Sequence, residues 1–70
     1  MKIALSEHAK KRLIERGITK QNIEEAIEMP DYTIKKVNKT EAYKKIKDKT
    51  LKVVYANENK FIKIITLIWK

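Results

Sequence analysis

The chain has 70 residues, enough for one small domain with one modest hydrophobic core. It has no cysteine and one histidine, which excludes a disulfide framework and a metal centre built from histidines and cysteines, and no apolar run is long enough to span a membrane. Its 17 lysines and arginines against 9 acidic residues give a formal net charge of +8, which indicates a polyanionic partner, most often nucleic acid. The abundant lysine, isoleucine and glutamate are also typical of thermophile proteins, but such proteins balance lysine with glutamate. We therefore expect a cytoplasmic protein that contacts nucleic acid and needs no cofactor.

The first predicted helix covers Ser6–Arg16 and follows an extended lead-in at Lys2–Leu5. The hydroxyl of Ser6 can cap the helix by accepting a hydrogen bond from a free amide of the first turn. Gly17 is well placed to end the helix in the left-handed conformation that other residues resist.

The second predicted helix starts at a Thr19 cap and ends near Pro30. Its apolar residues Ile23, Ala26 and Ile27 have helical spacing, so they are expected to face the core. Two short helices in a row predict a helical hairpin or corner.

After the proline, the apolar residues alternate with a period of two, which predicts strands. The predicted strands are Tyr32–Val37, Ala42–Lys47, Thr50–Ala56 and Lys60–Trp69. The last strand is apolar on both faces, which favours a central position, and its parity places Thr66 on one face with Ile62, Ile64 and Ile68. Because the links are short, we expect an α+β domain in which two N-terminal helices pack on a four-stranded antiparallel sheet, in the order ααββββ.

The first predicted helix contains the only histidine and both arginines of the chain. His8 and Arg12 are four residues apart and so share one side of the helix, with Arg16 one turn further. Arginine can bind two phosphate oxygens with its planar fork, and histidine can move a proton near neutral pH. A nuclease with this composition would act without a metal and cleave RNA through its own 2′-hydroxyl, and Tyr55, Lys63 or Thr66 could assist from the sheet.

Each of these residues has a structural alternative. A single histidine near a helix start is commonly a surface residue or a cap partner, and the two arginines can pair with Glu7, Glu15 or the acidic second helix. The basic second strand is either a charged edge that resists aggregation or a surface that binds an RNA backbone. The residues predicted to bind RNA come from this strand, from the first helix and from the two last strands, and they are Lys11, Tyr43, Lys44, Lys45, Lys47, Tyr55 and Lys63.

The opening stretch resembles a family of small uncharacterised bacterial and archaeal domains that begin with Ser-x-His-Ala-x-x-Arg followed by Arg-Gly-Ile. The matching residues are Ser6, His8, Ala9, Arg12, Arg16, Gly17 and Ile18, and the closing Ile64-Ile65-Thr66-Leu67 matches the family's last strand. That family is similar to the metal-independent RNase toxins of the barnase, EndoU, colicin and RelE type. The resemblance implies an RNA-cleaving toxin that a partner antitoxin protein neutralises. It also implies His8, Arg12 and Thr66 as active-site residues, with Arg16 as a weaker fourth.

Three function classes therefore remain open from the sequence. The first is a metal-independent endoribonuclease, plausible as the toxin of a toxin–antitoxin pair. The second is a non-catalytic module that binds nucleic acid or regulates a toxin. The third is a protein–protein module whose charge only aids solubility.

Overall fold

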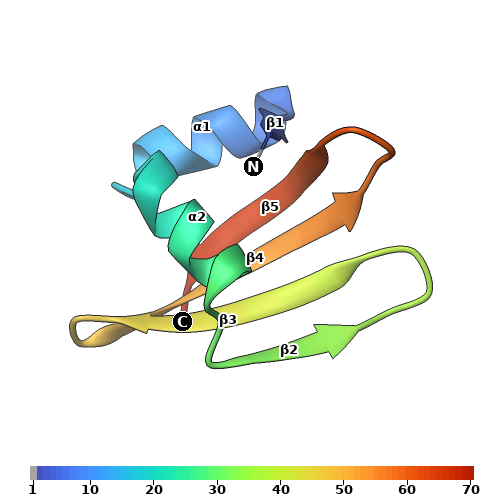
Figure 1. The fold of residues 1–70 in the computed structure, drawn as a ribbon. Coiled ribbons are helices and arrows are strands. Elements are labelled where there is room, and N and C mark those ends of the chain that lie inside the picture. The colour runs from blue at the N-terminus through green and yellow to red at the C-terminus, as the bar shows by residue number, and fades with distance from the viewer. Residues whose placement is uncertain (1) are drawn as a thin grey trace.

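In the computed structural model, which describes residues 2–70, the chain forms one five-stranded sheet and two helices (Figure 1). The strands lie in the sheet in the order β1-β5-β4-β3-β2. The elements in chain order are β1 (Ile3–Leu5), α1 (Glu7–Glu15), α2 (Lys20–Glu28), β2 (Tyr32–Lys35), β3 (Thr40–Ile46), β4 (Lys49–Asn57) and β5 (Ile62–Trp69).

Both helices begin and end as the sequence predicts. The side chain of Ser6 accepts a hydrogen bond of 3.1 Å from the amide of Ala9, and Gly17 has a φ of 63° just after α1. Thr19 and Asn22 form a reciprocal capping box at the start of α2, in which each side chain accepts from the other residue's amide. These caps satisfy amides that a helix leaves without an internal partner.

The predicted four-stranded antiparallel sheet is wrong. The lead-in contains a strand, β1, which lies parallel to β5 with Ile3 opposite Ile62 and Leu5 opposite Ile64. The sheet is therefore mixed and five-stranded, and the two helices follow a strand instead of beginning the chain. Three residues are too few to show the alternation of a strand, and the partner of β1 lies at the other end of the sequence, so no local pattern reveals the pairing.

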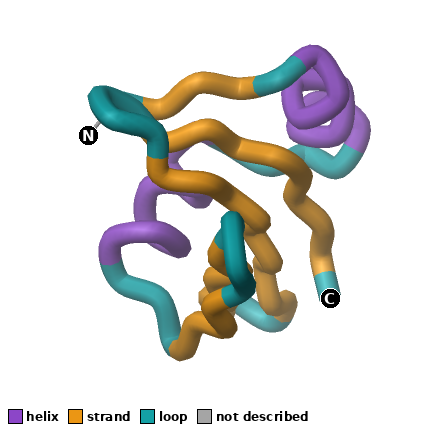
Figure 2. Tube along the Cα trace, turned by 90° about the vertical axis from the view of Figure 1, so that its right-hand side faces the viewer, coloured by secondary structure: helices purple, strands orange, loops and turns teal. Residues whose placement is uncertain are grey.

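The hydrophobic core lies between the helices and one face of the sheet. Helix α1 contacts β5, while α2 contacts β3 and β4. The strands curve instead of lying flat, as Figure 2 shows from the side. The largest fully buried side chains come from α2 and the two central strands, and they are Ile23, Leu51, Val53, Ile64 and Leu67.

A bulge in β5 overturns the predicted position of Thr66. Ile64 pairs with Tyr55 and Thr66 pairs with Val54, so Ile65 is an extra residue between them. Ile64 and Leu67 are consequently both fully buried although they are three residues apart. The bulge moves Thr66 to the sheet face opposite Ile64, so the predicted shared face with Ile62 and Ile64 is wrong.

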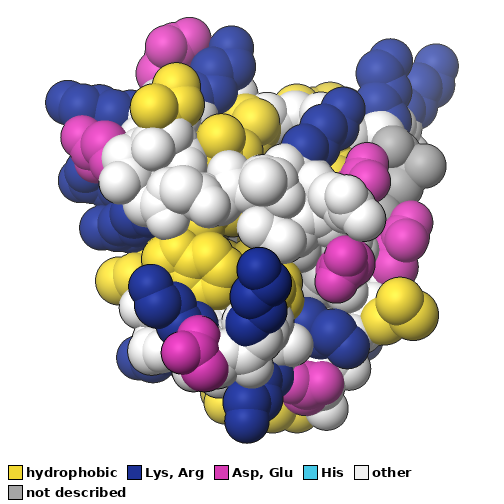
Figure 3. Space-filling model, turned by 90° about the vertical axis from the view of Figure 1, so that its left-hand side faces the viewer, with side chains coloured by type: hydrophobic (Ala, Val, Ile, Leu, Met, Phe, Trp, Pro, Cys, Tyr) yellow, Lys and Arg dark blue, Asp and Glu magenta, His cyan; other side chains and the backbone are white. Residues whose placement is uncertain are grey.

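The surface of the molecule carries the positive charge in several places. Figure 3 shows the side on which the β3–β4 turn and the junction of the two helices lie, with lysine and arginine side chains around an exposed hydrophobic area.

Neither helix in residues 2–70 combines the length and apolar character needed to cross a bilayer.

Candidate active site

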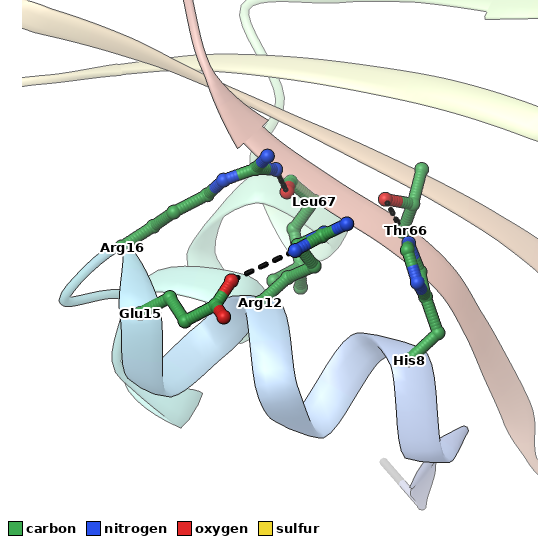
Figure 4. Close-up of polar contacts among 6 residues, drawn as sticks. All are labelled: His8, Arg12, Glu15, Arg16, Thr66 and Leu67. Carbon is green, nitrogen blue, oxygen red and sulfur yellow. Dashed lines mark hydrogen bonds and ion pairs between the residues drawn. The ribbon is translucent and has the colours of Figure 1, made fainter.

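His8 and Thr66 meet at the edge of the sheet although 58 residues separate them. The Nε2 atom of His8 lies 3.4 Å from the Oγ1 atom of Thr66 (Figure 4). His8 is exposed in the first turn of α1, and Thr66 is half-buried in the middle of β5. The Thr66 hydroxyl can donate to a bare ring nitrogen or accept from a protonated one, so this contact is compatible with both states of the imidazole.

Arg12 lies one helical turn beyond His8. Its Nη1 atom is 2.8 Å from Oε1 of Glu15, and both side chains of this pair are partly exposed, at 33% and 46%. An exposed pair on one helix stabilises by only about 0.3–0.5 kcal/mol, so an incoming phosphate can replace the carboxylate. Figure 4 shows the guanidinium above β5, between Arg16 and the His8–Thr66 pair.

Arg16 connects the end of α1 to the backbone of β5. Its Nη1 atom donates to the carbonyl oxygen of Leu67 at 2.7 Å, and its own carbonyl oxygen accepts from Nε1 of Trp69 at 2.6 Å. The amide of Lys70 bonds to Thr50 on β4, and antiparallel bonding alternates along the strand, so the carbonyl of Leu67 points to the outer edge of β5. Arg16 therefore closes an edge that β1 does not reach, and it fixes where α1 stands.

The three basic side chains of α1 thus have different surroundings. His8 and Arg12 expose polar atoms to solvent at the position where Thr66 reaches the edge. Arg16 differs from them, because one of its guanidinium N–H groups donates to the backbone carbonyl of Leu67. Within residues 2–70, no three histidine, cysteine or acidic side chains lie close enough to hold a metal ion.

The structure scatters the predicted RNA-binding residues over several surfaces. Exposed positions on α1, β3, the β3–β4 turn and β5 are taken by Lys11, Lys45, Lys47 and Lys63. Lys44 is half-buried, with its Nζ atom 3.7 Å from Oδ1 of Asp31. Tyr55 belongs to the core beneath the helices, so its prediction as an RNA-binding residue is wrong.

Sequence reasoning missed an aromatic cluster on the sheet face that the helices leave uncovered. Tyr32 stacks on the predicted residue Tyr43 with ring centroids 4.5 Å apart, and Nζ of Lys52 lies 5.8 Å from the Tyr43 ring. Lys52 also lies 3.8 Å from Glu41, which accepts from the Tyr43 hydroxyl. Tyr32 and Tyr43 are directly opposite in the β2–β3 register, and only that register brings them together.

The hollows of the surface do not coincide with the His8–Thr66 contact. A pocket of about 640 Å³ lies at the β4–β5 turn and is lined by Lys2 and residues 57–61. A pocket of about 440 Å³ lies at the opposite end of β5, beside Trp69. The candidate site itself is an open ridge, which suits a polymer more than an enclosed small molecule.

One family model matches the chain over residues 5–69, and its description is "Domain of unknown function (DUF4258)". The match includes α1 and all of β5, and hence every residue of the candidate site. No curated protein and no solved structure matches the chain. The predicted resemblance to an uncharacterised domain family is confirmed at this level, and the similarity to RNase toxins stays a prediction.

Proposed function

This chain belongs to the family described as Domain of unknown function (DUF4258), and we propose that it is a metal-independent endoribonuclease. The observation that carries the proposal is the contact of 3.4 Å between His8 Nε2 and Thr66 Oγ1, one helical turn from Arg12. A group that moves protons, a hydroxyl and a guanidinium stand together on an exposed ridge of a protein with a net charge of +8. That combination supports chemistry at a phosphodiester.

In the proposed reaction, His8 accepts the proton of an RNA 2′-hydroxyl, and this oxygen attacks the adjacent phosphorus. The bond between phosphorus and the 5′ oxygen of the next nucleotide breaks, and that oxygen takes a proton from water. The products are a 2′,3′-cyclic phosphate and a 5′-hydroxyl, and His8 returns its proton to solvent. DNA lacks the attacking hydroxyl, so RNA is the substrate.

The other side chains of the ridge bind and orient in this scheme. The guanidinium of Arg12 leaves Glu15 and holds two oxygens of the scissile phosphate, where it stabilises the charge that develops during attack. The Oγ1 atom of Thr66 lies beside the Nε2 atom of His8, so the Thr66 hydroxyl orients the imidazole ring or donates to a phosphate oxygen. Arg16 acts as a positioning residue, because its contact with Leu67 sets the place of α1 on β5.

The proposal is tested by incubating purified protein with end-labelled single-stranded RNA in EDTA. We expect cleavage that leaves 2′,3′-cyclic phosphate ends, and no cleavage where the 2′-hydroxyl is replaced by hydrogen. His8→Ala should lower the rate by about 10²–10⁴-fold, the usual contribution of a general base. Arg12→Ala should lower it by about 10²–10³-fold, as for a lost transition-state donor.

The matched control is Lys10→Ala on the same helix. Lys10 is exposed and its Nζ atom lies 3.8 Å from Glu7, so Lys10→Ala lowers the net charge by the same amount as Arg12→Ala and leaves the residues of the site in place. It should cleave at nearly the wild-type rate. Equal cleavage by the His8→Ala, Arg12→Ala double variant and the wild type would remove both residues from the mechanism.

The proposal extends to a toxin that a partner protein neutralises, as the resemblance to RNase toxins implies. Expression of the wild-type chain in a bacterial host should stop growth, whereas the His8→Ala chain should not. Co-expression of the protein encoded beside it should restore growth. Equal growth arrest by wild type and His8→Ala would separate toxicity from the proposed chemistry.

A second candidate function is nucleic-acid binding without catalysis, and the exposed ring of Tyr32, which stacks on the buried Tyr43 beside Lys52, favours it. Aromatic rings and lysines on an open sheet face are a common platform for single-stranded nucleic acid. This function predicts binding that weakens steeply with salt and yields no product. In that case, variants of Lys44, Lys45 and Lys47 should weaken binding more than His8→Ala does.

A further inference from the structure

The pocket beside Trp69, which we call the Trp69 pocket, brings together the helix junction, the β3–β4 turn and the last strand. Its volume is about 440 Å³. Trp69, the only tryptophan of the chain, forms one wall. The other lining residues come from the helix junction and the turn, and they are Gly17, Thr19, Asn22, Ile46, Lys47, Asp48 and Lys49.

The indole ring of Trp69 is fixed by a hydrogen bond and by packing against the core, and it remains partly exposed to solvent. Its Nε1 atom donates to the carbonyl of Arg16 at 2.6 Å, and the ring packs partly against the core. The ammonium of Lys49 lies 5.8 Å from the ring centroid. An aromatic ring whose orientation is fixed, and which lies in the wall of a pocket with an exposed lysine nearby, is a platform on which a flat base can stack.

Polar groups surround this platform. The capping box uses the Oδ1 atom of Asn22 and the Oγ1 atom of Thr19 as acceptors, so the Asn22 NH2 group and the Thr19 hydroxyl hydrogen keep their capacity to donate. The carboxylate of Asp48 supplies an acceptor at the turn. Donors and acceptors around an aromatic surface are what the edge of a nucleobase requires.

Two lysines stand at the rim and supply positive charge. The ion pairs that lysines form among residues 2–70 use Lys10, Lys44 and Lys52, so neither Lys47 nor Lys49 is held in an ion pair. Lys47 has a φ of 60°, a left-handed conformation that disfavours residues other than glycine, and it holds its side chain at the turn. Figure 3 shows this side of the molecule, with basic side chains around an exposed hydrophobic area.

Arg16 links the Trp69 pocket to the candidate active site through two hydrogen bonds. The residue that donates to Leu67 on β5 also supplies the carbonyl that holds Trp69. From His8 to Arg16, the helix rises about 12 Å, so a short single-stranded segment can reach from one to the other.

We propose that the Trp69 pocket binds one base of the single-stranded RNA whose phosphate lies at His8 and Arg12. The base stacks on Trp69 in the place of the Lys49 ammonium, and Lys47 and Lys49 contact the neighbouring phosphates. The inference rests on the proposed ribonuclease function only for the path of the strand. Binding of the base itself needs no cleavage.

The test uses the fluorescence of Trp69 in the full chain carrying His8→Ala, so that RNA is not consumed. Titration with adenosine or guanosine monophosphate should quench the indole saturably, with purines binding more tightly than pyrimidines because they stack over a larger area. Ribose 5-phosphate, which has the phosphate but no base, should not quench. A quench by ribose phosphate equal to that by the nucleotides, or no saturable quench, overturns the proposal.

Variants of the two rim lysines distinguish binding of nucleotide in the Trp69 pocket from a general attraction of anions to a positively charged protein. Lys49→Gln and Lys47→Gly should each weaken nucleotide binding roughly fivefold, as expected for one lost charge-assisted contact. Lys47→Gly also gives the turn a residue suited to its left-handed backbone, so weaker binding by this variant is not a folding defect. Lys60→Gln, at the exposed β4–β5 turn, is the matched control and should bind normally. Equal weakening by all three variants overturns the pocket.

The outcomes also distinguish this proposal from the ribonuclease. Quenching by nucleotides in the His8→Ala chain, together with no RNA cleavage by the wild-type chain, keeps the Trp69 pocket and overturns the catalytic proposal. RNA cleavage by the wild-type chain that is lost in His8→Ala, together with no quenching in the His8→Ala chain, keeps the ribonuclease and overturns the pocket.

Discussion

The two outer edges of the sheet are treated in opposite ways. At the β5 edge, β1 pairs with Ile62–Ile64, and Arg16 then takes the exposed carbonyl of Leu67. At the β2 edge, all four residues of the strand are exposed, and lysines follow it. The first edge is closed by contacts between distant parts of the chain, whereas the second stays open, and the shortness of its strand and the lysines that follow it discourage pairing with other chains.

The difference between the edges indicates where a fold of this size can hold several functional side chains in fixed positions. Side chains that act together on one phosphate must be held in fixed relative positions. At the β5 edge, the same contacts that close the sheet fix His8 against Thr66. At the β2 edge, lysines supply positive charge without a fixed geometry, which suits long-range attraction of an anionic partner more than catalysis.

The largest expected effect on stability comes from a buried side chain of β5, the strand at the closed edge. Leu67→Ala removes a fully buried side chain and should lower the free energy of unfolding by about 2–5 kcal/mol, as for other large-to-small changes in a core. Ile34→Ala on β2 is the matched control, since Ile34 is 41% exposed, and it should cost about 0.5 kcal/mol. Urea unfolding measures both values. Similar losses in the two variants would mean that the edges do not differ in stability.

A smaller effect tests the guanidinium that closes the edge. Arg16→Ala leaves the Leu67 carbonyl without its charged donor and should cost about 1.5–3 kcal/mol. Arg12→Ala, which removes only an exposed pair with Glu15, and Lys35→Ala at the open edge should each change stability by about 0.5 kcal/mol or less. Thermal unfolding of the three variants at one pH compares them. If Arg16→Ala unfolds like Lys35→Ala, the edge is not held by this contact.

The smallest effect concerns the residue that turns the chain away from the closed edge. Gly17 has a φ of 63°, and a β-carbon added there would meet no atom within 4 Å. Gly17→Ala should therefore lose about 1 kcal/mol from backbone strain alone, and Gly17→Asn should lose less because asparagine tolerates this conformation. Chemical unfolding resolves the pair. An alanine variant as stable as the wild type would show that the turn relaxes without cost.

Much of the local structure could be read from single positions in the sequence. The caps at Ser6 and Thr19 and the left-handed residue at Gly17 follow from the chemistry of one or two side chains, and the structure confirms them. The pairing of β1 with β5 could not be read, because it joins residues about 60 positions apart in three-residue segments. The predicted antiparallel sheet was wrong for this reason.

The candidate site also has some features that the sequence predicts and others that depend on packing. The spacing of His8, Arg12 and Arg16 predicts three basic side chains on one helix. Which of them meets Thr66, which meets a backbone carbonyl and which pairs with Glu15 depends on how α1 lies on β5. The bulge at Ile65 also had no local signal, although it decides the face on which Thr66 lies.

By itself, the sequence determined the elements from α1 to β5, their caps, the positive charge and the candidate residues of the helix, because these depend on neighbours along the chain. Only the tertiary structure decided the fifth strand, the closed edge and the meeting of His8 with Thr66. Those features depend on pairing and packing between the two ends of the chain, where the hydrogen bonds of one segment are completed by another.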